Sequence, residues 1–211
     1  MTVKDSLFLS IAASLAKDGY IVLTNFLPSQ IIQQLYDHVI ALPNESFHQA
    51  RIGSKKNLQL NKKVRNDKSL WLSDQRPIEK NYLAIMEECR IQLNKRLFLG
   101  IQHFEAHFSY YKTGAFYQRH IDSFKGQSHR IISSVFYLNP SWSDDNGGEL
   151  ILYEPDSDNV LCTIKPHFGT MVLFLSEEFT HEVLPTKYDR YSIAGWFHTD
   201  NITDRVTCYV Y

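Results

Sequence analysis

The residues of this chain that could bind a metal ion are His120 and Asp122, two positions apart, and a distant histidine, His181. The string His120-Ile121-Asp122 is β-like, and side chains two apart on a strand share a face, so both can converge on one ion. His181 opens another predicted strand. Two histidines and one carboxylate on one face of an octahedral ion leave three positions open, which is typical of non-haem iron(II) oxygenases. A 2-oxo acid would take two of them and dioxygen the third.

Arg190, nine residues after His181, supports this interpretation. A 2-oxo diacid that chelates a metal at one end needs a cation at the other, and the planar guanidinium matches a carboxylate. Strand alternation in RYSIAGWF predicts one shared face for Arg190, Ser192, Ala194 and Trp196, and the two small side chains leave room for a ligand. An unpaired arginine on a core strand would cost roughly 3–5 kcal/mol, so it calls for an anion. Pairing of Arg190 with a nearby Asp or Glu remains the alternative.

The elements that must position these residues change character near the middle of the chain. Apolar residues recur at helical spacing in three segments, residues 7–15, 28–39 and 76–98, with a β-like run at 20–26. From about residue 103 the period becomes two, in HFEAHFSYY, HRIISSVFYL, GELILYE, NVLCTIK, GTMVLFL, HEVLP and RYSIAGWF, with turn signals at 112–114, 144–148 and 156–159. Many short strands predict a sandwich or barrel. We expect an α+β fold: an antiparallel double-stranded β-helix (jelly roll) buttressed by N-terminal helices.

Length and composition predict a single domain over residues 1–211. The chain is 44% hydrophobic and 21% charged, as in an ordinary globular protein. We expect residues 1–100 to form helical support and 103–199 the catalytic jelly roll. Residues 51–68 differ, with seven Lys or Arg against one acid, Asp67. Such a segment is either a solvated loop or a mobile flap over the site.

Charge, cysteine usage and hydropathy weigh against several other classes of protein. A net charge of −1 gives no overall attraction to nucleic acid or membrane. Three scattered cysteines without a CxxC motif predict neither a disulfide framework nor a cysteine zinc site. No stretch approaches transmembrane length, and the N-terminus lacks the basic region and long apolar run of a signal peptide. The expected location is a reducing cytoplasm.

Residues 106–199 resemble the prolyl 4-hydroxylase family of iron(II)/2-oxoglutarate dioxygenases. Within it they are most similar to the oxygen-sensing prolyl hydroxylases of animals and their short bacterial relatives. The strings that carry the resemblance are YYKTGAFYQRHID, SSVFYLNPSW, GGELILY and HEVLPTKYDRYSIAGWF, with VRNDKSLWL as a weaker match upstream. They cover a little over half of the chain and are highly specific in combination.

The resemblance implies a cofactor site built on iron(II) and 2-oxoglutarate. Iron would be bound by His120, Asp122 and His181, and the distal carboxylate of 2-oxoglutarate by Arg190. Ser192 shares the face of Arg190, and further pocket residues are implied at Tyr110, Tyr137, Leu150, Val183 and Trp196. The products would be succinate and CO₂, and ascorbate would rescue oxidised iron. Each aromatic residue could instead simply pack in the core.

On the substrate side, the resemblance implies hydroxylation at C4 of a prolyl residue in a protein. Tyr117 and Trp196 would lie near the target proline, and Asp67 would pair with Arg130. Family members act on a translation elongation factor or a ribosomal protein, so a translation component is the first expected partner. The chain departs from the animal enzymes at residues 112–116, where they carry a Gly-rich turn, at Ala194, where they have threonine, and throughout 51–68. These departures put the identity of the substrate in doubt.

Other functions remain possible on the sequence alone. The chain could be an oxygenase of a small molecule or free amino acid, or a cupin-like module that binds metal without turnover. Nucleic-acid demethylases resemble one another in a second arginine six residues after the first, where this chain has Trp196. A zinc hydrolase could use two histidines and an aspartate but would have no use for Arg190.

Overall fold

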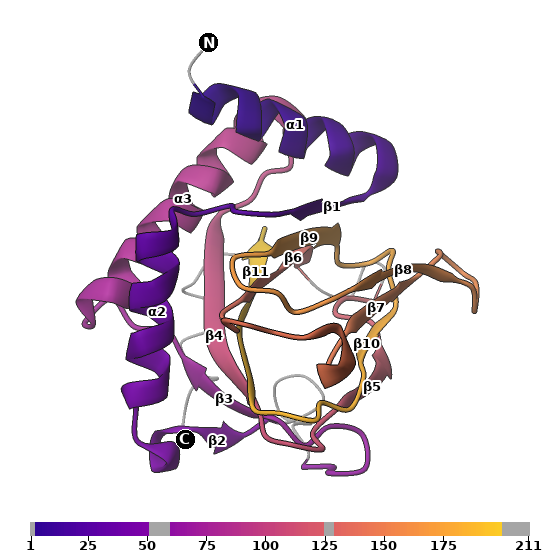
Figure 1. Cartoon of the computed structure of the whole chain (residues 1–211). Helices are drawn as coiled ribbons and strands as arrows, with labels where there is room; N and C mark the ends of the chain where they lie inside the picture. Colours follow the sequence, from indigo (N-terminus) through magenta and orange to yellow (C-terminus); the bar gives the residue numbers. More distant parts are fainter. Residues whose placement is uncertain (1–2, 51–59, 125–128, 200–211) are drawn as a thin grey trace.

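The computed structural model describes residues 3–50, 60–124 and 129–199, in which three helices cover one face of a large antiparallel sheet (Figure 1). The helices are α1 (Val3–Asp18), α2 (Ser29–Ala41) and α3 (Pro77–Leu97), with short 3-10 turns at Asn44–Ser46 and Asp144–Asn146. Proline at the first position of α3 is suited to a helix start. The buried side chains Tyr82, Met86, Cys89 and Leu93 recur every three or four residues and so form one face.

The strands form two sheets. In the seven-stranded sheet the order is β1 (Tyr20–Leu23), β9 (Met171–Leu175), β6 (Arg130–Tyr137), β11 (Arg190–His198), β4 (His103–Tyr111), β3 (Lys68–Trp71) and β2 (His48–Gln49). In the four-stranded sheet it is β5 (Tyr117–His120), β10 (His181–Val183), β7 (Leu150–Tyr153) and β8 (Val160–Ile164). All of these pairs are antiparallel.

The large sheet is buried on both faces, and β9 shows how its sequence achieves this. Met171 and Leu173 belong to the core shared with the helices, whereas Val172 and Phe174 belong to a second core that includes residues of the small sheet. A strand with two buried faces needs apolar residues at every position, and MVLFL supplies them. The space between the sheets is therefore a separate layer, and it contains the candidate site.

The expected jelly roll with N-terminal helices is confirmed, as are the seven β-rich runs and the three helical segments. Two strands were not predicted. β2 and β3 extend the large sheet, and Lys68 at the end of the predicted flap is the first residue of β3. Residues 51–59 of that flap lie outside the described part of the chain.

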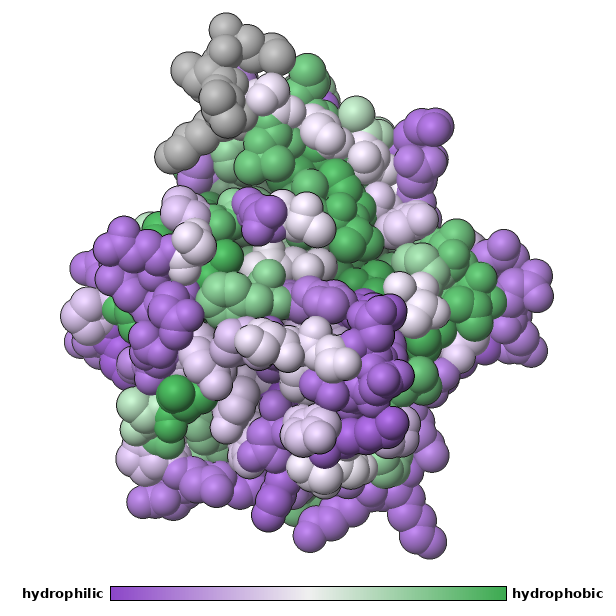
Figure 2. Space-filling model, in the orientation of Figure 1, coloured by the Kyte–Doolittle hydropathy of each residue, from purple (hydrophilic) through white to green (hydrophobic). Residues whose placement is uncertain are grey.

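The surface is mixed in character. Figure 2 shows hydrophilic side chains over much of one face, with apolar ones gathered toward its upper part. Leu9 in α1 and Val22 in β1 are both exposed. Within the described ranges, no helix is both long and apolar enough to cross a membrane.

Candidate active site

Three potential metal ligands meet at one end of the small sheet. His120 and His181 lie opposite each other in the β5–β10 pair, with ring centroids 4.2 Å apart. The two carboxylate oxygens of Asp122 each lie 3.7 Å from one Nε2 atom, Oδ1 from that of His120 and Oδ2 from that of His181. All three ligand atoms are within 4.8 Å of one another. The structure thus brings together the triad that the sequence singled out.

Asp122 reaches this position by a different route from the predicted one. The expectation that His120 and Asp122 share the face of one strand is wrong, because β5 ends at His120 and Asp122 lies in the bend that follows. The bend turns the carboxylate back toward the histidines. Two hydrogen bonds hold it there: Ser133 Oγ donates to Asp122 Oδ2 at 2.7 Å, and Trp196 Nε1 donates to the same oxygen at 2.9 Å.

The orientation of both imidazole rings is set by backbone carbonyls. His120 Nδ1 lies 2.9 Å from the carbonyl oxygen of Gln118, and His181 Nδ1 lies 3.1 Å from that of Phe179. A carbonyl can only accept, so each Nδ1 carries the proton and each Nε2 presents its lone pair to the cluster. This is the tautomer that a metal requires.

Electrostatics favour the ligand forms of these side chains. Burial, with the neighbouring His181 adding to it, lowers the pKa of His120 to about 3, so its imidazole is neutral. Burial alone would raise the pKa of Asp122, but the histidines, Arg130 and the Ser133 hydrogen bond outweigh it and hold that pKa below its usual range. A neutral His120 imidazole beside an ionised Asp122 carboxylate is suited to binding a divalent cation.

Arg190 lies between the two sheets with only 1% of its surface exposed. Its guanidinium donates to Ser192 Oγ at 3.3 Å, and its Nε has no hydrogen-bond partner. Among the described residues no carboxylate comes within ion-pair distance of it, so the alternative of a protein counter-ion finds no support there. An uncompensated buried cation is costly, and a bound anion would remove the cost.

The surroundings of Arg190 form a pocket of mixed chemistry. Its guanidinium carbon lies 4.7 Å from the ring centre of Tyr111 and 5.0 Å from that of Tyr137. The Tyr137 hydroxyl is buried without a hydrogen-bond partner, and burial raises its pKa to about 12. Leu150 and Val183, which are register partners in β7 and β10, belong to the same intersheet core. Two unsatisfied donors, Arg190 Nε and the Tyr137 hydroxyl, are thus surrounded by largely apolar side chains.

The predicted pocket residue Tyr110 lies on the wrong face. Register partners in an antiparallel pair project to the same side, and Arg190 pairs with Tyr111 whereas Tyr110 pairs with Tyr191. The Tyr110 hydroxyl donates to Asp189 at 2.6 Å, and its ring stacks on Tyr191 on the helix side of the sheet. The sequence did not identify Tyr111 as a neighbour of Arg190. Tyr110 and Tyr111 are adjacent in the string SYY, and nothing in that string indicates which of the two faces Arg190.

The expected pair between Asp67 and Arg130 is also wrong. Asp67 is fully buried and accepts hydrogen bonds from Arg65 at 2.7 and 2.8 Å. The Arg65 guanidinium in turn covers the ring of Tyr117 at 4.0 Å, and Tyr117 stacks on His120. Arg130 instead stacks on Trp196 at 3.9 Å and lies 3.5 Å from Glu105. Tyr117 and Trp196 thus both adjoin the metal cluster, as the resemblance implied.

A second group of metal-ligand residues was not anticipated. His103, Glu105 and His198 also place one ligand atom each within 4.8 Å of the others. The sequence does contain an indication of this second group, because His103-Phe104-Glu105 repeats the spacing of His120-Ile121-Asp122 within a β-rich run.

The comparisons with known proteins agree with this geometry. Residues 106–198 match the model of the 2OG-Fe(II) oxygenase superfamily. Human Egl nine homolog 1 is 27% identical over 191 residues, which is 86% of this chain and 44% of the human protein. The chain thus spans about half the length of the curated relatives it matches.

Two solved structures are similar over nearly the whole chain. A prolyl-4-hydroxylase from Pseudomonas putida is 33% identical with a TM-score of 0.82, covering 92% of this chain and 100% of that one. A prolyl hydroxylase from Trichoplax adhaerens, in complex with a hypoxia-inducible-factor peptide, is 27% identical with a TM-score of 0.79, covering 92% and 90%. The chain belongs to the 2OG-Fe(II) oxygenase superfamily.

Iron(II) and 2-oxoglutarate follow from this membership, and the residues present fit both. The histidine and aspartate cluster offers two neutral nitrogens and one carboxylate, which leaves positions for the co-substrate and dioxygen. Arg190 Nε and the Tyr137 hydroxyl are buried polar atoms without partners in the described structure. A carboxylate placed between them would accept from both.

Proposed function

We propose that this chain is a prolyl 4-hydroxylase of protein substrates. His120, Asp122 and His181 would bind iron(II), and Arg190 would bind the distal carboxylate of 2-oxoglutarate. When bound, iron and 2-oxoglutarate supply the oxidising chemistry: one oxygen atom of O₂ enters succinate as CO₂ is lost, and the other enters the C4–H bond of a prolyl residue.

The observation that carries this proposal is the buried, uncompensated guanidinium of Arg190. A structural arginine at 1% exposure would need a carboxylate from the protein, and none of the described residues supplies one. A dicarboxylic co-substrate meets this need and explains the small Ser192 beside the guanidinium. Tyr137 would donate its hydroxyl proton to the same carboxylate, since its raised pKa keeps it protonated at neutral pH.

The other residues of the site would orient the reactants and exclude water. Ser133 and Trp196 fix the Asp122 carboxylate, and the backbone carbonyls fix both imidazole rings. Leu150 and Val183 would cover the methylene chain of 2-oxoglutarate with apolar surface. A closed, apolar wall limits the access of water to the reacting atoms.

A protein substrate is supported by the relatives and by the entrance of the site. The Trichoplax neighbour was solved with a peptide, and prolyl hydroxylases stand among the similar proteins. Tyr117 and Trp196 lie beside the cluster with Arg65 and Arg130 stacked on them, and these four side chains would border the target proline. A translation component remains our first candidate substrate, and ascorbate dependence and a cytoplasmic location remain predictions.

The proposal is tested by turnover assays with iron(II), 2-oxoglutarate and one candidate substrate at a time: elongation factor Tu, a collagen-like peptide or free proline. Succinate is measured together with oxygen gain on proline by mass spectrometry. We expect a protein substrate to be hydroxylated, with higher total turnover when ascorbate is added. Turnover of free proline or another metabolite, with no hydroxyproline in any protein, would contradict the substrate class and favour a small-molecule oxygenase. Metal binding without any succinate formation would favour a cupin-like module.

A further inference from the structure

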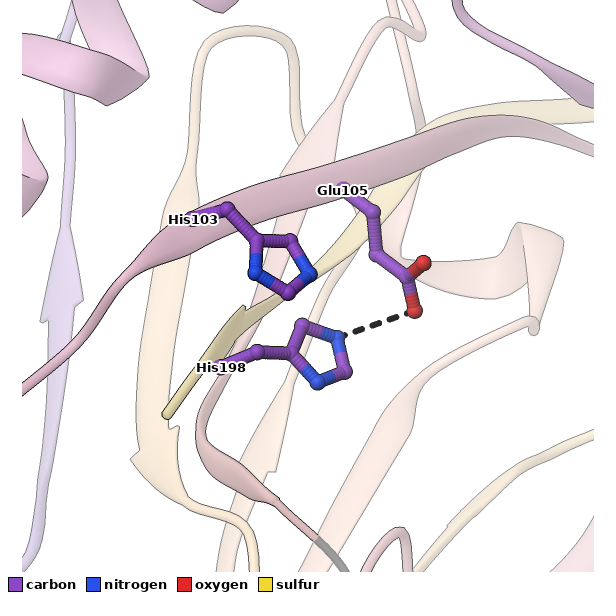
Figure 3. Close-up of side chains that lie close together, drawn as sticks. All are labelled: His103, Glu105 and His198. Atoms are coloured by element: carbon purple, nitrogen blue, oxygen red, sulfur yellow. Dashed lines mark hydrogen bonds and ion pairs between the residues drawn. The ribbon is translucent and has the colours of Figure 1, made fainter. Parts of the chain in front are cut away.

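A second cluster of histidine and glutamate side chains lies at the far end of the two strands that carry Arg190 and Tyr111. His103 and Glu105 are two apart within β4, so they project from the same face. His198 ends β11 and is the register partner of His103. Figure 3 shows the two imidazole rings facing each other with the Glu105 carboxylate beside them. Both strands are rigid parts of the large sheet, which suits a preformed site.

The geometry of this cluster resembles that of a metal site more than that of a single hydrogen bond. The rings of His103 and His198 are parallel within 3° at a centroid distance of 4.7 Å, so their nitrogen atoms lie side by side. His198 Nε2 is 2.9 Å from Glu105 Oε1, and each of the three residues has a ligand atom within 4.8 Å of the other two. Ligands of one tetrahedral ion at bond lengths of about 2.0–2.2 Å lie slightly over 3 Å apart. Because the two rings are stacked in parallel planes, one ring would have to rotate for both lone pairs to point at one ion.

Burial adds a second argument. His198 is fully buried and His103 is 8% exposed, and they lie beside the carboxylate of Glu105, a side chain that is rarely buried unless it is paired. A metal ion satisfies several such groups at once, whereas hydrogen bonds must satisfy each atom separately.

This cluster is separate from the iron ligands, but one layer of side chains connects the two. Arg130 lies 3.5 Å from Glu105 Oε1 and stacks on the indole of Trp196, whose Nε1 donates to Asp122. Arg130 lies directly against the carboxylate of Glu105. The guanidinium offsets the negative charge of Glu105, which disfavours hard cations that depend on charge and favours an ion that bonds well to imidazole.

We propose that His103, Glu105 and His198 form a second metal site, which binds a zinc-class divalent ion with water completing the coordination. Two imidazole nitrogens and one carboxylate oxygen are ligands that zinc accepts at a tetrahedral site with one open position. The three residues include none of the proposed ligands of iron or 2-oxoglutarate, so occupancy of this site can be measured separately.

The test is the number of zinc ions bound per chain. Metal-free full-length protein is titrated with Zn²⁺ against a chelating dye, and the metal retained after gel filtration is measured by mass spectrometry. We expect two zinc ions in the wild type, one in the His120→Ala/His181→Ala variant and one in Glu105→Gln. His167→Gln removes a half-exposed histidine outside both clusters and should leave two.

The double variant keeps the test decisive even if substitution of a buried cluster residue disturbs folding, because it leaves the second cluster intact. Cobalt(II) bound to that variant should also give the intense visible absorption of a low-coordinate ion with nitrogen ligands. Zinc binding at one ion per wild-type chain, and none in the double variant, would overturn the proposal and leave the cluster as a hydrogen-bonded group.

Discussion

Asp122 depends on its neighbours more than either histidine does. It lies beyond the end of β5, so its carboxylate is oriented by hydrogen bonds from Ser133 and Trp196 rather than by a strand. Ser133 is itself within 2.9 Å of Ser176 Oγ, which extends the support into β6 and the turn after β9. Removing a single donor should therefore loosen the metal site without removing a ligand.

The Trp196→Phe variant keeps an aromatic ring but loses the donor to Asp122 Oδ2. We expect its affinity for Mn²⁺, used in place of iron, to fall by about 10–100-fold, as for other hydrogen-bond partners of metal ligands. Trp142→Phe is the matched control, because the Trp142 indole donates to the carbonyl of Gly147 and not to a ligand. Equal affinities for the two variants, measured by calorimetric titration, would show that the indole does not support Asp122.

His107 makes the protein sensitive to acid. It is buried between Trp71 and Trp196, and burial, with a contribution from Arg65, lowers its pKa to about 4. The unfolded chain binds a proton at this histidine below about pH 6.5, while the folded protein does not until about pH 4. The unfolding free energy should therefore fall as the pH is lowered through this window, by on the order of 1 kcal/mol per pH unit.

The His107→Gln variant tests this linkage, because glutamine does not titrate. Urea denaturation between pH 7 and pH 5 should show a shallower loss of stability in the variant than in the wild type. Parallel curves would mean that His107 is not the group responsible.

At the level of single residues, the sequence was a better guide to the metal-binding triad and Arg190 than to the residues that surround them. The triad and Arg190 could be chosen because their chemistry is specific. Tyr110 and Tyr111 have the same chemistry, and only the register of β4 against Arg190 in β11 decides which of them faces the pocket. The partner of Asp67 depended likewise on the path of residues 60–67, which no periodic pattern describes.

Among the elements of the site, the start of β7 controls the space around Arg190. Gly148 precedes Leu150 with φ +70°, and a Cβ added there would lie 3.0 Å from Arg190 Cδ and 3.2 Å from Thr186. Gly148→Ala should thus strain the backbone and also displace the guanidinium. We expect about a tenfold loss of 2-oxoglutarate affinity along with a loss of stability on the order of 1 kcal/mol.

Gly114→Ala separates these two effects. Gly114 also has positive φ, at +82°, but a Cβ there meets no atom within 4 Å. It should lose similar stability in thermal denaturation while retaining 2-oxoglutarate affinity. The same loss of affinity in both variants would attribute the effect to backbone strain elsewhere, not to contact with Arg190.

Helices and strands were predictable where their periodic pattern of apolar residues extends over many residues. α3 spans six turns of helical spacing, and β4 and β11 are nine residues each. β2 and β3, of two and four residues, are too short to show a period. β3 forms on the edge that β4 offers, and β2 in turn pairs with β3. The end of β5 was missed because alternation alone does not mark where a strand stops.

At the scale of the whole molecule, the core that packs against the helices and the candidate active site occupy different layers. The helices pack on the outer face of the large sheet in a core that contains none of the proposed metal ligands (Figure 1). Chelation of the metal by EDTA should therefore lower the melting temperature by the linkage of binding to folding, while far-UV circular dichroism stays unchanged. Loss of the β signal on chelation would show that the sheets depend on the metal.

The organisation as one domain stays a proposal, supported by the way α1 and α3 pack on each other and on strands of the large sheet. A single cooperative thermal transition in both the metal-free and the metal-loaded protein is the result expected of such an arrangement.

We expect Arg190 to hold the distal carboxylate of 2-oxoglutarate beside a metal bound by His120, Asp122 and His181. The most direct measurement is anaerobic calorimetric titration of the Mn²⁺-loaded protein with 2-oxoglutarate, comparing the wild type with Arg190→Met and with Arg96→Met, a control on α3. We expect Arg190→Met to weaken 2-oxoglutarate binding by roughly 1.5–3 kcal/mol, with Mn²⁺ affinity unchanged and Arg96→Met like the wild type. Unchanged 2-oxoglutarate affinity in Arg190→Met would contradict this role of Arg190.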